Sequence, residues 1–217
     1  MDFAAARRNM VASQIRTNRV TDGRIISALG EIPREVFVAE EKAGIAYVDE
    51  ALALGGGRYL MEPMAFALLL QAADIGGDDV VLDIGCATGY SSAVLAHLAG
   101  TVVALEEDAA FAARATELLA ELKIDNVAVM EGPLTGGYGN QAPYNAIVFS
   151  GAVAEVPGAI TGQLADGGRL VCIEAGENGI GRGIVVGKYG ESVSRRHVFD
   201  AGSPILPGFE RHPAFSF

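Results

Sequence analysis

The sequence has no tryptophan and only two cysteines among its 217 residues. Cys86 and Cys172 lie far apart and form no Cys-x-x-Cys or Cys/His ligand spacing, so we expect no metal site. The most apolar stretch, residues 64–73, is too short to span a bilayer. Arg7 and Arg8 near the N-terminus are not followed by an apolar run. We therefore expect no signal peptide and a cytoplasmic protein.

Basic residues are also scarce. The 16 Lys and Arg are outnumbered by 27 Asp and Glu, which gives a net charge of −11. This balance argues against a nucleic-acid partner and against an anionic membrane surface. Half of the residues are hydrophobic, enough for a sizeable core. We expect one domain over residues 1–217, and the sequence does not indicate an oligomeric state.

The chain is organised around a strand that runs into a turn of small residues. Residues 80–84 are apolar apart from Asp83, and Gly85, Ala87 and Gly89 follow. Such a turn lets a ligand approach the backbone closely. The next predicted strand ends at Glu106, where a carboxylate suits the two hydroxyls of a ribose. Glycine-rich turns without a ligand also occur in many α/β proteins, so that alternative stays open.

The spacing of this turn separates two classes of nucleotide-binding enzyme. The dinucleotide fingerprint needs a third glycine where Tyr90 stands, so an oxidoreductase is disfavoured. The short form, Asp83-x-Gly85-x-Ala87-x-Gly89 followed by an acidic strand end, resembles the S-adenosylmethionine-dependent methyltransferases.

Strand and helix patterns alternate after residue 78, which predicts a parallel sheet covered by helices. The predicted strands are 79–84, 101–106, 126–131, 144–150 and 169–174, with helices at 90–99, 108–123 and 157–165 between them. Residues 184–189 and 192–199 flank Gly190-Glu191 and predict an antiparallel edge hairpin. We expect the tail, residues 204–217, to pack across the surface without regular structure.

The N-terminal part predicts helices and loops. A helix is expected over residues 4–19, and a second one from an N-cap at Thr21 to a stop at Gly30. Three glycines, 55–57, precede Arg58 and the helix that Pro63 opens. This loop is predicted either as a lid or substrate contact, or as a surface connector.

Several segments in order carry a more specific resemblance. These segments are Met10-Val11-x-x-Gln14-Ile15, Ile32-Pro33-Arg34-Glu35-x-Phe37-Val38, Ala46-Tyr47-x-Asp49-x-Ala51-Leu52, Gly89-Tyr90-Ser91-Ser92-Ala93-Val94-Leu95-Ala96, Ala142-Pro143-Tyr144-Asn145-x-Ile147-Val148 and Gln163-Leu164-x-x-Gly167-Gly168-Arg169-Leu170-Val171. In this order they resemble the protein-L-isoaspartate (D-aspartate) O-methyltransferases. The match covers nearly the whole chain.

The resemblance implies a Class I, Rossmann-like methyltransferase fold, with residues 1–75 as a helical, substrate-side extension and 76–217 as the cofactor-binding core. It implies methyl transfer from S-adenosylmethionine to isoaspartyl carboxylates in damaged proteins. Carried over by position, the cofactor residues are Asp83, Gly85, Ala87, Gly89, Glu106, Glu107, Gly132 and Pro133.

Three segments depart from the family's pattern. Its loop Gly-Gln-Thr-Ile-Ser-Gln-Pro is Gly57-Arg58-Tyr59-Leu60-Met61-Glu62-Pro63, so Met61 replaces the serine near the reacting centre. Pro133 replaces an aspartate expected to contact adenine. Asn145 replaces an aspartate in the fourth strand of the core, and the Thr-Ala-Ala-Ala that follows is Ser150-Gly151-Ala152-Val153.

The catalytic residues are therefore open. Arg58, Tyr59 and Glu62 are the nearby candidates; Arg58 either offsets Glu62 and binds a carboxylate, or is a solvent-exposed loop residue. His97, His197 and His212 have no Ser or Cys partner at a catalytic spacing. Two alternatives stand beside isoaspartyl methylation: a non-catalytic or regulatory relative that kept the fold, and a methyltransferase with another acceptor.

Overall fold

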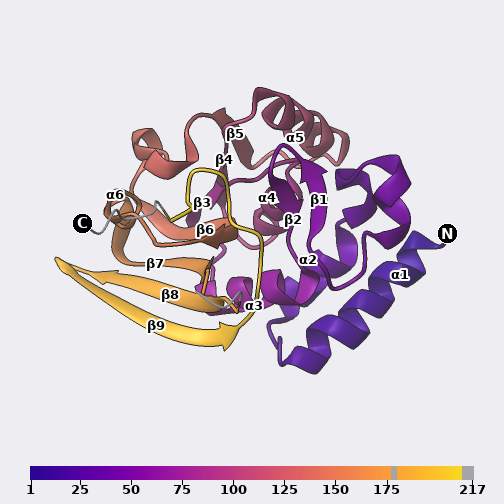
Figure 1. Cartoon of the computed structure of the whole chain (residues 1–217), viewed down its shortest axis with the longest axis horizontal. Helices are drawn as coiled ribbons and strands as arrows, with labels where there is room; N and C mark the ends of the chain where they lie inside the picture. Colours follow the sequence, from indigo (N-terminus) through magenta and orange to yellow (C-terminus); the bar gives the residue numbers. More distant parts are fainter. Residues whose placement is uncertain (177–179, 212–217) are drawn as a thin grey trace, which may run out of the picture.

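The strands that alternation predicted form one seven-stranded sheet. A computed structural model describes residues 1–176 and 180–211 (Figure 1). The strand order across the sheet is β5-β4-β3-β6-β7-β8-β9. The bounds are β3 (Val80–Ile84), β4 (Thr101–Glu106), β5 (Val127–Glu131), β6 (Tyr144–Val153), β7 (Leu164–Glu174), β8 (Arg182–Tyr189) and β9 (Ser192–Asp200).

The pairing of these strands fixes where a ligand site can lie. The strands β5, β4, β3, β6 and β7 pair in parallel, and β8 and β9 add the predicted antiparallel edge. The chain runs outward from β3 through β4 to β5, then returns to place β6 on the other side of β3. The carboxyl ends of β3 and β6 therefore meet at the point where the strand order reverses, which is where open α/β sheets bind ligands.

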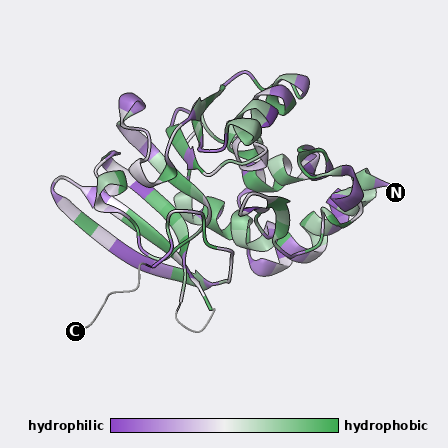
Figure 2. Ribbon diagram, turned by 45° about the horizontal axis from the view of Figure 1, so that its top comes forward, coloured by the Kyte–Doolittle hydropathy of each residue, from purple (hydrophilic) through white to green (hydrophobic). Residues whose placement is uncertain are grey.

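Apolar side chains cover both faces of the sheet, since neighbouring strand residues alternate between faces. Val81 and Val102 face the core cluster that contains α3 (Pro63–Ala73), α4 (Tyr90–Ala96) and α5 (Ala109–Glu121). Leu82 and Val103 face a second cluster. β9 is the polar, mostly exposed edge strand (Figure 2).

The second face is covered by less helix than predicted. The expected helix at 157–165 is only α6 (Gly158–Thr161), because β7 already begins at Leu164. Irregular segments complete that face: Leu134, Leu206 and Phe209 are buried there with Ile160. The prediction that the tail packs without regular structure is confirmed as far as Arg211, apart from an isolated bridge between Ile205 and Ala152.

The N-terminal helices differ from the predictions in detail. Helical residues run from α1 (Phe3–Met10) through a π-helical stretch, Val11–Ile15, and a 3₁₀ turn, Arg16–Asn18. The predicted N-cap Thr21 is wrong: Asp22 caps α2 (Gly23–Glu31), and its carboxylate accepts from the Arg24 backbone N–H.

Gly30 does not stop this helix as predicted. It lies within α2, and the helix ends at Glu31 because Ile32 is extended (φ −69°, ψ 122°). A residue that precedes proline is driven out of the helical region, and Pro33 follows here. Two short 3₁₀ segments, Arg34–Phe37 and Glu40–Ile45, then lead toward the sheet.

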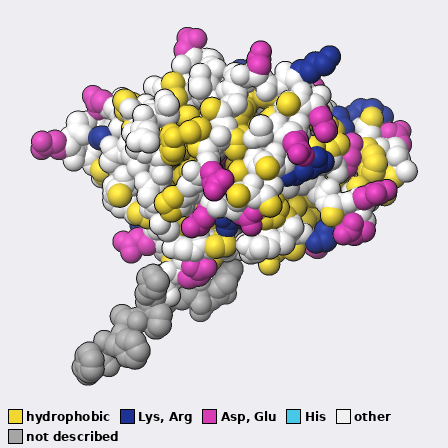
Figure 3. Space-filling model, turned by 90° about the horizontal axis from the view of Figure 1, so that it is seen from above, with side chains coloured by type: hydrophobic (Ala, Val, Ile, Leu, Met, Phe, Trp, Pro, Cys, Tyr) yellow, Lys and Arg dark blue, Asp and Glu magenta, His cyan; other side chains and the backbone are white. Residues whose placement is uncertain are grey.

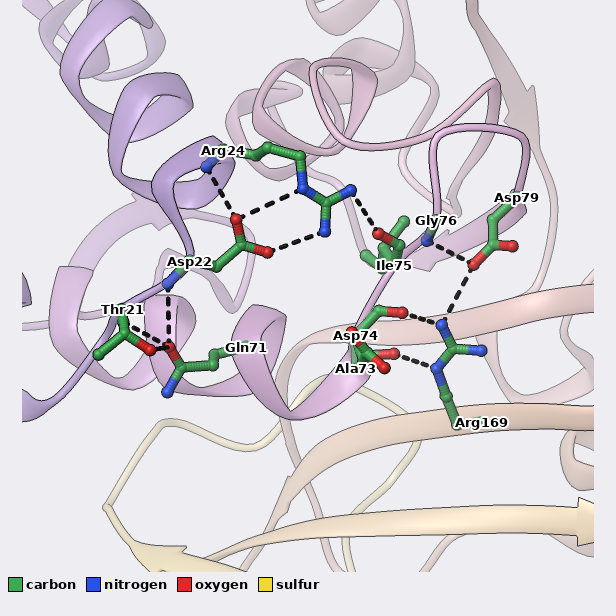
Figure 4. A network of polar contacts seen from close by, with 10 residues as sticks. All are labelled: Thr21, Asp22, Arg24, Gln71, Ala73, Asp74, Ile75, Gly76, Asp79 and Arg169. Carbon is green, nitrogen blue, oxygen red and sulfur yellow. Dashed lines mark hydrogen bonds and ion pairs between the residues drawn. The ribbon is translucent and has the colours of Figure 1, made fainter.

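Polar contacts join the start of α2 to α3 and to the segment that leads into β3 (Figure 4). Arg24 Nη1 donates to the Ile75 carbonyl (2.8 Å), and the Thr21 N–H donates to Gln71 Oε1 (2.6 Å). Arg169 of β7 pairs with Asp79, just before β3 (Nη2 to Oδ2, 3.3 Å). None of these contacts involves the carboxyl end of the sheet.

A small hairpin stands apart from the large sheet. The stretch that was predicted as a loop forms β1 (Leu52–Gly55) and β2 (Arg58–Leu60), a separate antiparallel pair. Ala53 pairs with Tyr59, and Gly55 pairs with Arg58 across the turn. The first residue of β2 is therefore held at the tip of the hairpin.

Candidate functional site

The turn after β3 requires glycine at two positions. Gly85 and Gly89 have φ of +80° and +94°, and Ala87 also has a positive φ of +47°. A β-carbon on Gly85 would come within 2.8 Å of Leu206 Cδ2, and one on Gly89 within 3.1 Å of Ala115 Cβ. The small residues of this turn thus match a backbone that other residues adopt only with strain.

Asp83 lies at the base of the turn and is fully buried. Its Oδ2 accepts from Ser91 and Ser92 (2.6 Å each), and its Oδ1 accepts from Ser150 (2.7 Å). Burial raises the pKa of Asp83, and the three hydroxyls oppose that rise. The carboxylate therefore joins β3, α4 and β6. These serines were not among the predicted site residues; the signal for Ser150 was its place in β6, the strand next to β3, close to Asp83.

Glu106 ends β4 beside the same turn, as predicted, and its side chain is fully buried. Three backbone N–H groups donate to its carboxylate, those of Ala87 (2.9 Å), Glu107 (2.8 Å) and Asp108 (3.0 Å). Asp83 and Glu106 thus flank the turn from adjacent strands.

Arg58 supplies the counter-charge to Glu106. Its Nε lies 3.0 and 3.2 Å from the two carboxylate oxygens, and its Nη2 lies 2.7 Å from Oε1. Only 4% of the Arg58 side chain is exposed. The interpretation of Arg58 as an exposed loop residue is therefore wrong, and its partner is Glu106 and not Glu62. Arginine is seldom buried without a charged partner, so Arg58 was predicted to be exposed. The local sequence did not reveal its partner, Glu106.

A second buried arginine lies under the hairpin. Arg34 Nε donates to the Ala46 carbonyl (2.6 Å), and its Nη2 donates to the Met61 carbonyl. Its guanidinium lies 4.8 Å from the centre of the Tyr90 ring. Burial lowers the pKa of Arg34 and raises that of Tyr90. Arg34 therefore fixes the backbone of Met61, a role that the sequence analysis did not assign.

The remaining predicted cofactor residues gather at the same end of the sheet. The Gly132 N–H donates to the Glu106 carbonyl (3.0 Å), and Pro133 opens a 3₁₀ turn. That turn buries Leu134 near Gly85. The predicted residues from the ends of β3, β4 and β5 are thus brought together.

The hairpin residues next to Arg58 lie differently. Tyr59 is 37% exposed, Met61 is buried, and burial raises the pKa of the partly buried Glu62. The space between the turn, the hairpin and α3 is a cavity of only about 20 Å³. Small-molecule sites usually measure about 300–1,000 Å³. This cavity, which Gly85 and Ala87 line, is therefore too small for a small molecule in this arrangement.

The comparisons with known proteins agree with this architecture. The family model described as protein-L-isoaspartate(D-aspartate) O-methyltransferase matches residues 6–183. The chain belongs to this family. Protein-L-isoaspartate O-methyltransferase 2 of Anaeromyxobacter sp. (strain Fw109-5) is 38% identical over 192 residues, which cover 88% of this chain and 79% of that protein. Protein-L-isoaspartate O-methyltransferase 1 of Rhodopseudomonas palustris (strain HaA2) is 40% identical over 169 residues, 78% of this chain and 69% of that protein.

Solved structures confirm the predicted Class I methyltransferase fold. A protein-L-isoaspartate O-methyltransferase superposes with a TM-score of 0.81 at 24% identity and covers 93% of this chain and 66% of its own. A second, from Plasmodium falciparum and described as a putative protein-L-isoaspartate O-methyltransferase in complex with S-adenosyl-L-homocysteine, gives 0.77 at 17% identity. That match covers 95% of this chain and 98% of its own.

The structure separates the departures from the isoaspartyl methyltransferase pattern by position. Asn145 lies at the amino end of the sheet, where its Oδ1 accepts from the Val80 N–H (2.9 Å). It is remote from the turn and does not bear on the site. Met61 and Pro133 lie at the carboxyl end, beside the turn. Ser150 there donates to Asp83.

The histidines lie outside this site. His97 caps the C-terminus of α4 and lies 3.7 Å from Glu31 Oε2, and His197 lies in β9 as predicted. His212 falls outside the described residues. Among residues 1–176 and 180–211, no three His, Cys, Asp or Glu side chains form a group that could hold a metal. Within the same ranges, none of the helices has the length and apolar character needed to cross a membrane.

Proposed function

We propose that this chain binds S-adenosylmethionine, the cofactor of its family, and transfers the methyl group to the carboxylate of isoaspartyl residues in damaged proteins. The observation that carries the proposal is the placement of Asp83 and Glu106 on adjacent parallel strands, on either side of the Gly85–Gly89 turn. The turn would hold the amino-acid half of the cofactor, and Glu106 the ribose hydroxyls.

The cofactor supplies a methyl group on a sulfonium. A carboxylate oxygen would take this methyl group directly, with S-adenosylhomocysteine as the neutral leaving group and no proton transfer. A carboxyl group is ionised at pH 7, because its ordinary pKa is about 4, so no general base is needed. The protein's contribution is to align the two reactants. Met61 in place of the family's serine therefore affects orientation and not a proton-transfer step.

The second candidate is a relative that has kept the fold without catalysis. The ion pair between Arg58 and Glu106 favours it, since the acid expected to bind ribose is engaged by the protein itself. Met61 and Pro133 point the same way. A methyltransferase with another acceptor is a variant of the first candidate, in which Tyr59 and Glu62 would meet a different substrate.

Acidic side chains are scattered among hydrophobic ones on the face in Figure 3, in keeping with the net charge of −11.

Calorimetric titration and a peptide assay test the proposal in sequence. S-adenosylhomocysteine is titrated into the unaltered protein, into Glu106→Gln and into Glu117→Gln, an exposed acid of α5 that serves as control. We expect binding that Glu106→Gln weakens and Glu117→Gln leaves unchanged, followed by methyl-ester formation on an isoaspartyl peptide but not on its aspartyl isomer. Binding without ester formation favours the second candidate or another acceptor, and no binding at millimolar ligand contradicts the proposal.

A further inference from the structure

Glu106 has no acceptor capacity left in this structure. Arg58 donates three hydrogen bonds to it, and backbone N–H groups donate three more. A carboxylate offers about four lone-pair positions. A ribose that placed its two hydroxyls on Glu106 would have to take positions that Arg58 now uses. Arg58 and the ribose therefore exclude one another at this carboxylate.

The position of Arg58 in the fold allows it to leave. It opens β2, and β1 and β2 form their own sheet with no backbone pairing to the seven-stranded sheet. The turn before it, Gly55 to Gly57, has φ of +105°, +54° and +74°, so it follows a backbone path that depends on glycine. Withdrawal of Arg58 therefore breaks no backbone hydrogen bond of the strands that carry Asp83 and Glu106.

Desolvation also limits the net stability that this ion pair can contribute. Both side chains are almost completely removed from water, 4% and 0% exposed, and desolvation offsets much of the attraction in such pairs. Arg58 Nη1 has no hydrogen-bond partner among the described residues, so burial leaves one donor unsatisfied. When Arg58 leaves, Glu106 keeps its three backbone donors.

We propose that Arg58 is an internal competitor for the ribose of the cofactor: a ribonucleoside binds Glu106 only after the β1–β2 hairpin withdraws this arginine. The inference rests on the proposed function for the identity of the ligand. Only molecules in which Arg58 has left Glu106 can bind the ribonucleoside. The apparent affinity for this ligand is therefore the intrinsic affinity multiplied by the fraction of such molecules. Occupation of the site is then controlled by a residue that does not itself contact the bound cofactor.

Three variants and one pair of ligands test this. Arg58→Gln installs the residue that the family has in this loop and removes the charge. Arg58→Lys keeps the charge but loses the planar fork that engages both oxygens. Arg169→Gln is the matched control, because it removes the arginine of a second ion pair, partly buried and at the opposite end of the sheet (Figure 4). The ligands are S-adenosylhomocysteine and its analogue without the two ribose hydroxyls, with thermal unfolding recorded for each protein.

We expect Arg58→Gln to bind S-adenosylhomocysteine about tenfold more tightly or better than the unaltered protein, the factor set by a competent fraction of a tenth or less. Arg58→Lys should lie between the two, and Arg169→Gln should match the unaltered protein. The dideoxy analogue should gain much less from Arg58→Gln. The unaltered protein should discriminate poorly between the two ligands, a result that stands even where Arg58→Gln fails to fold.

The other outcomes overturn the inference in distinguishable ways. Equal affinity of the unaltered protein and Arg58→Gln leaves the proposed function standing and removes the competitor. Weaker binding by Arg58→Gln makes Arg58 a contributor to the cofactor site, which also contradicts the inference. Absence of binding by every variant at millimolar ligand overturns the proposed function and the competitor together.

Discussion

Leu206 lies directly over Gly85, so that a β-carbon on Gly85 would come within 2.8 Å of Leu206 Cδ2. Two backbone bonds hold the tail in this place: the Ala152 N–H donates to the Pro204 carbonyl (2.9 Å), and the Leu206 N–H donates to the Ala152 carbonyl (2.8 Å). The glycine turn and the C-terminal segment therefore form one packed unit, although about 120 positions separate them in the sequence.

This contact predicts that Gly85→Ala loses more stability than positive φ alone explains. Gly190 also has a positive φ, but it has open space around it, so Gly190→Ala should cost about 1–2 kcal/mol. Gly85→Ala should cost about 1–3 kcal/mol more because of overpacking against Leu206. Denaturant unfolding measures both, and adding Leu206→Ala should reduce the cost of Gly85→Ala. Equal costs for the two alanine variants would show that Leu206 yields freely.

The buried Asp83 predicts a pH dependence of stability. Burial raises its pKa above the ordinary 3.8, so the folded protein keeps a proton that the unfolded chain has released. Stability should therefore fall as the pH rises from about 4 toward the folded pKa, and the fall should be absent in Asp83→Asn.

Ser150→Ala is a second test, because it removes a hydroxyl that lowers the pKa of Asp83 and should extend the decline to higher pH. The quantity to measure is the free energy of unfolding of the three proteins between about pH 4 and pH 7. Parallel curves for the unaltered protein and Asp83→Asn would contradict the assignment.

Substitution of Arg34 should lower the stability of the fold, because its guanidinium holds the backbone beside the β1–β2 hairpin. In Arg34→Gln the Ala46 and Met61 carbonyls lose their donor, at about 1–3 kcal/mol for each carbonyl left unsatisfied. Arg114→Gln is the control, since Arg114 belongs to an exposed pair with Glu117, and it should cost at most about 1 kcal/mol. Denaturant midpoints compare the two variants, and equal losses would mean that the carbonyls find other donors.

If the chain methylates isoaspartyl residues, Met61→Ser should increase the rate of methyl transfer. The serine restores the residue that the family carries, so kcat on an isoaspartyl peptide should rise about tenfold, since small displacements of reacting groups change rates by up to about a hundredfold. Affinity for S-adenosylhomocysteine should stay the same. Met61→Ala separates the hydroxyl from the loss of bulk, and an equal gain in both variants would assign the effect to space alone.

The sheet and the glycine turn could be predicted because their signals are local. The predicted bounds of the strands in the large sheet agree to within two residues, except the start of β7 and the end of β6. Asp83 and Glu106 were placed correctly because carboxyl ends of parallel strands meet at one edge.

The hairpin and its contacts could not be predicted in the same way. Strands β1 and β2 have four and three residues, too few for a periodic pattern, and β1 ends in the first of three consecutive glycines. The partner of Arg58 lies 48 positions along the chain, and the cover of Gly85 lies in the tail. These contacts depend on tertiary packing, which also explains why Arg34 and Ser150 were not assigned.

A structure of the protein determined with S-adenosylhomocysteine tests the central claim most directly. Our account predicts the ribose hydroxyls on the Glu106 carboxylate, the three backbone donors unchanged, and Arg58 withdrawn from Glu106 with the β1–β2 hairpin. A ligand bound elsewhere while Arg58 remains on Glu106 would contradict it.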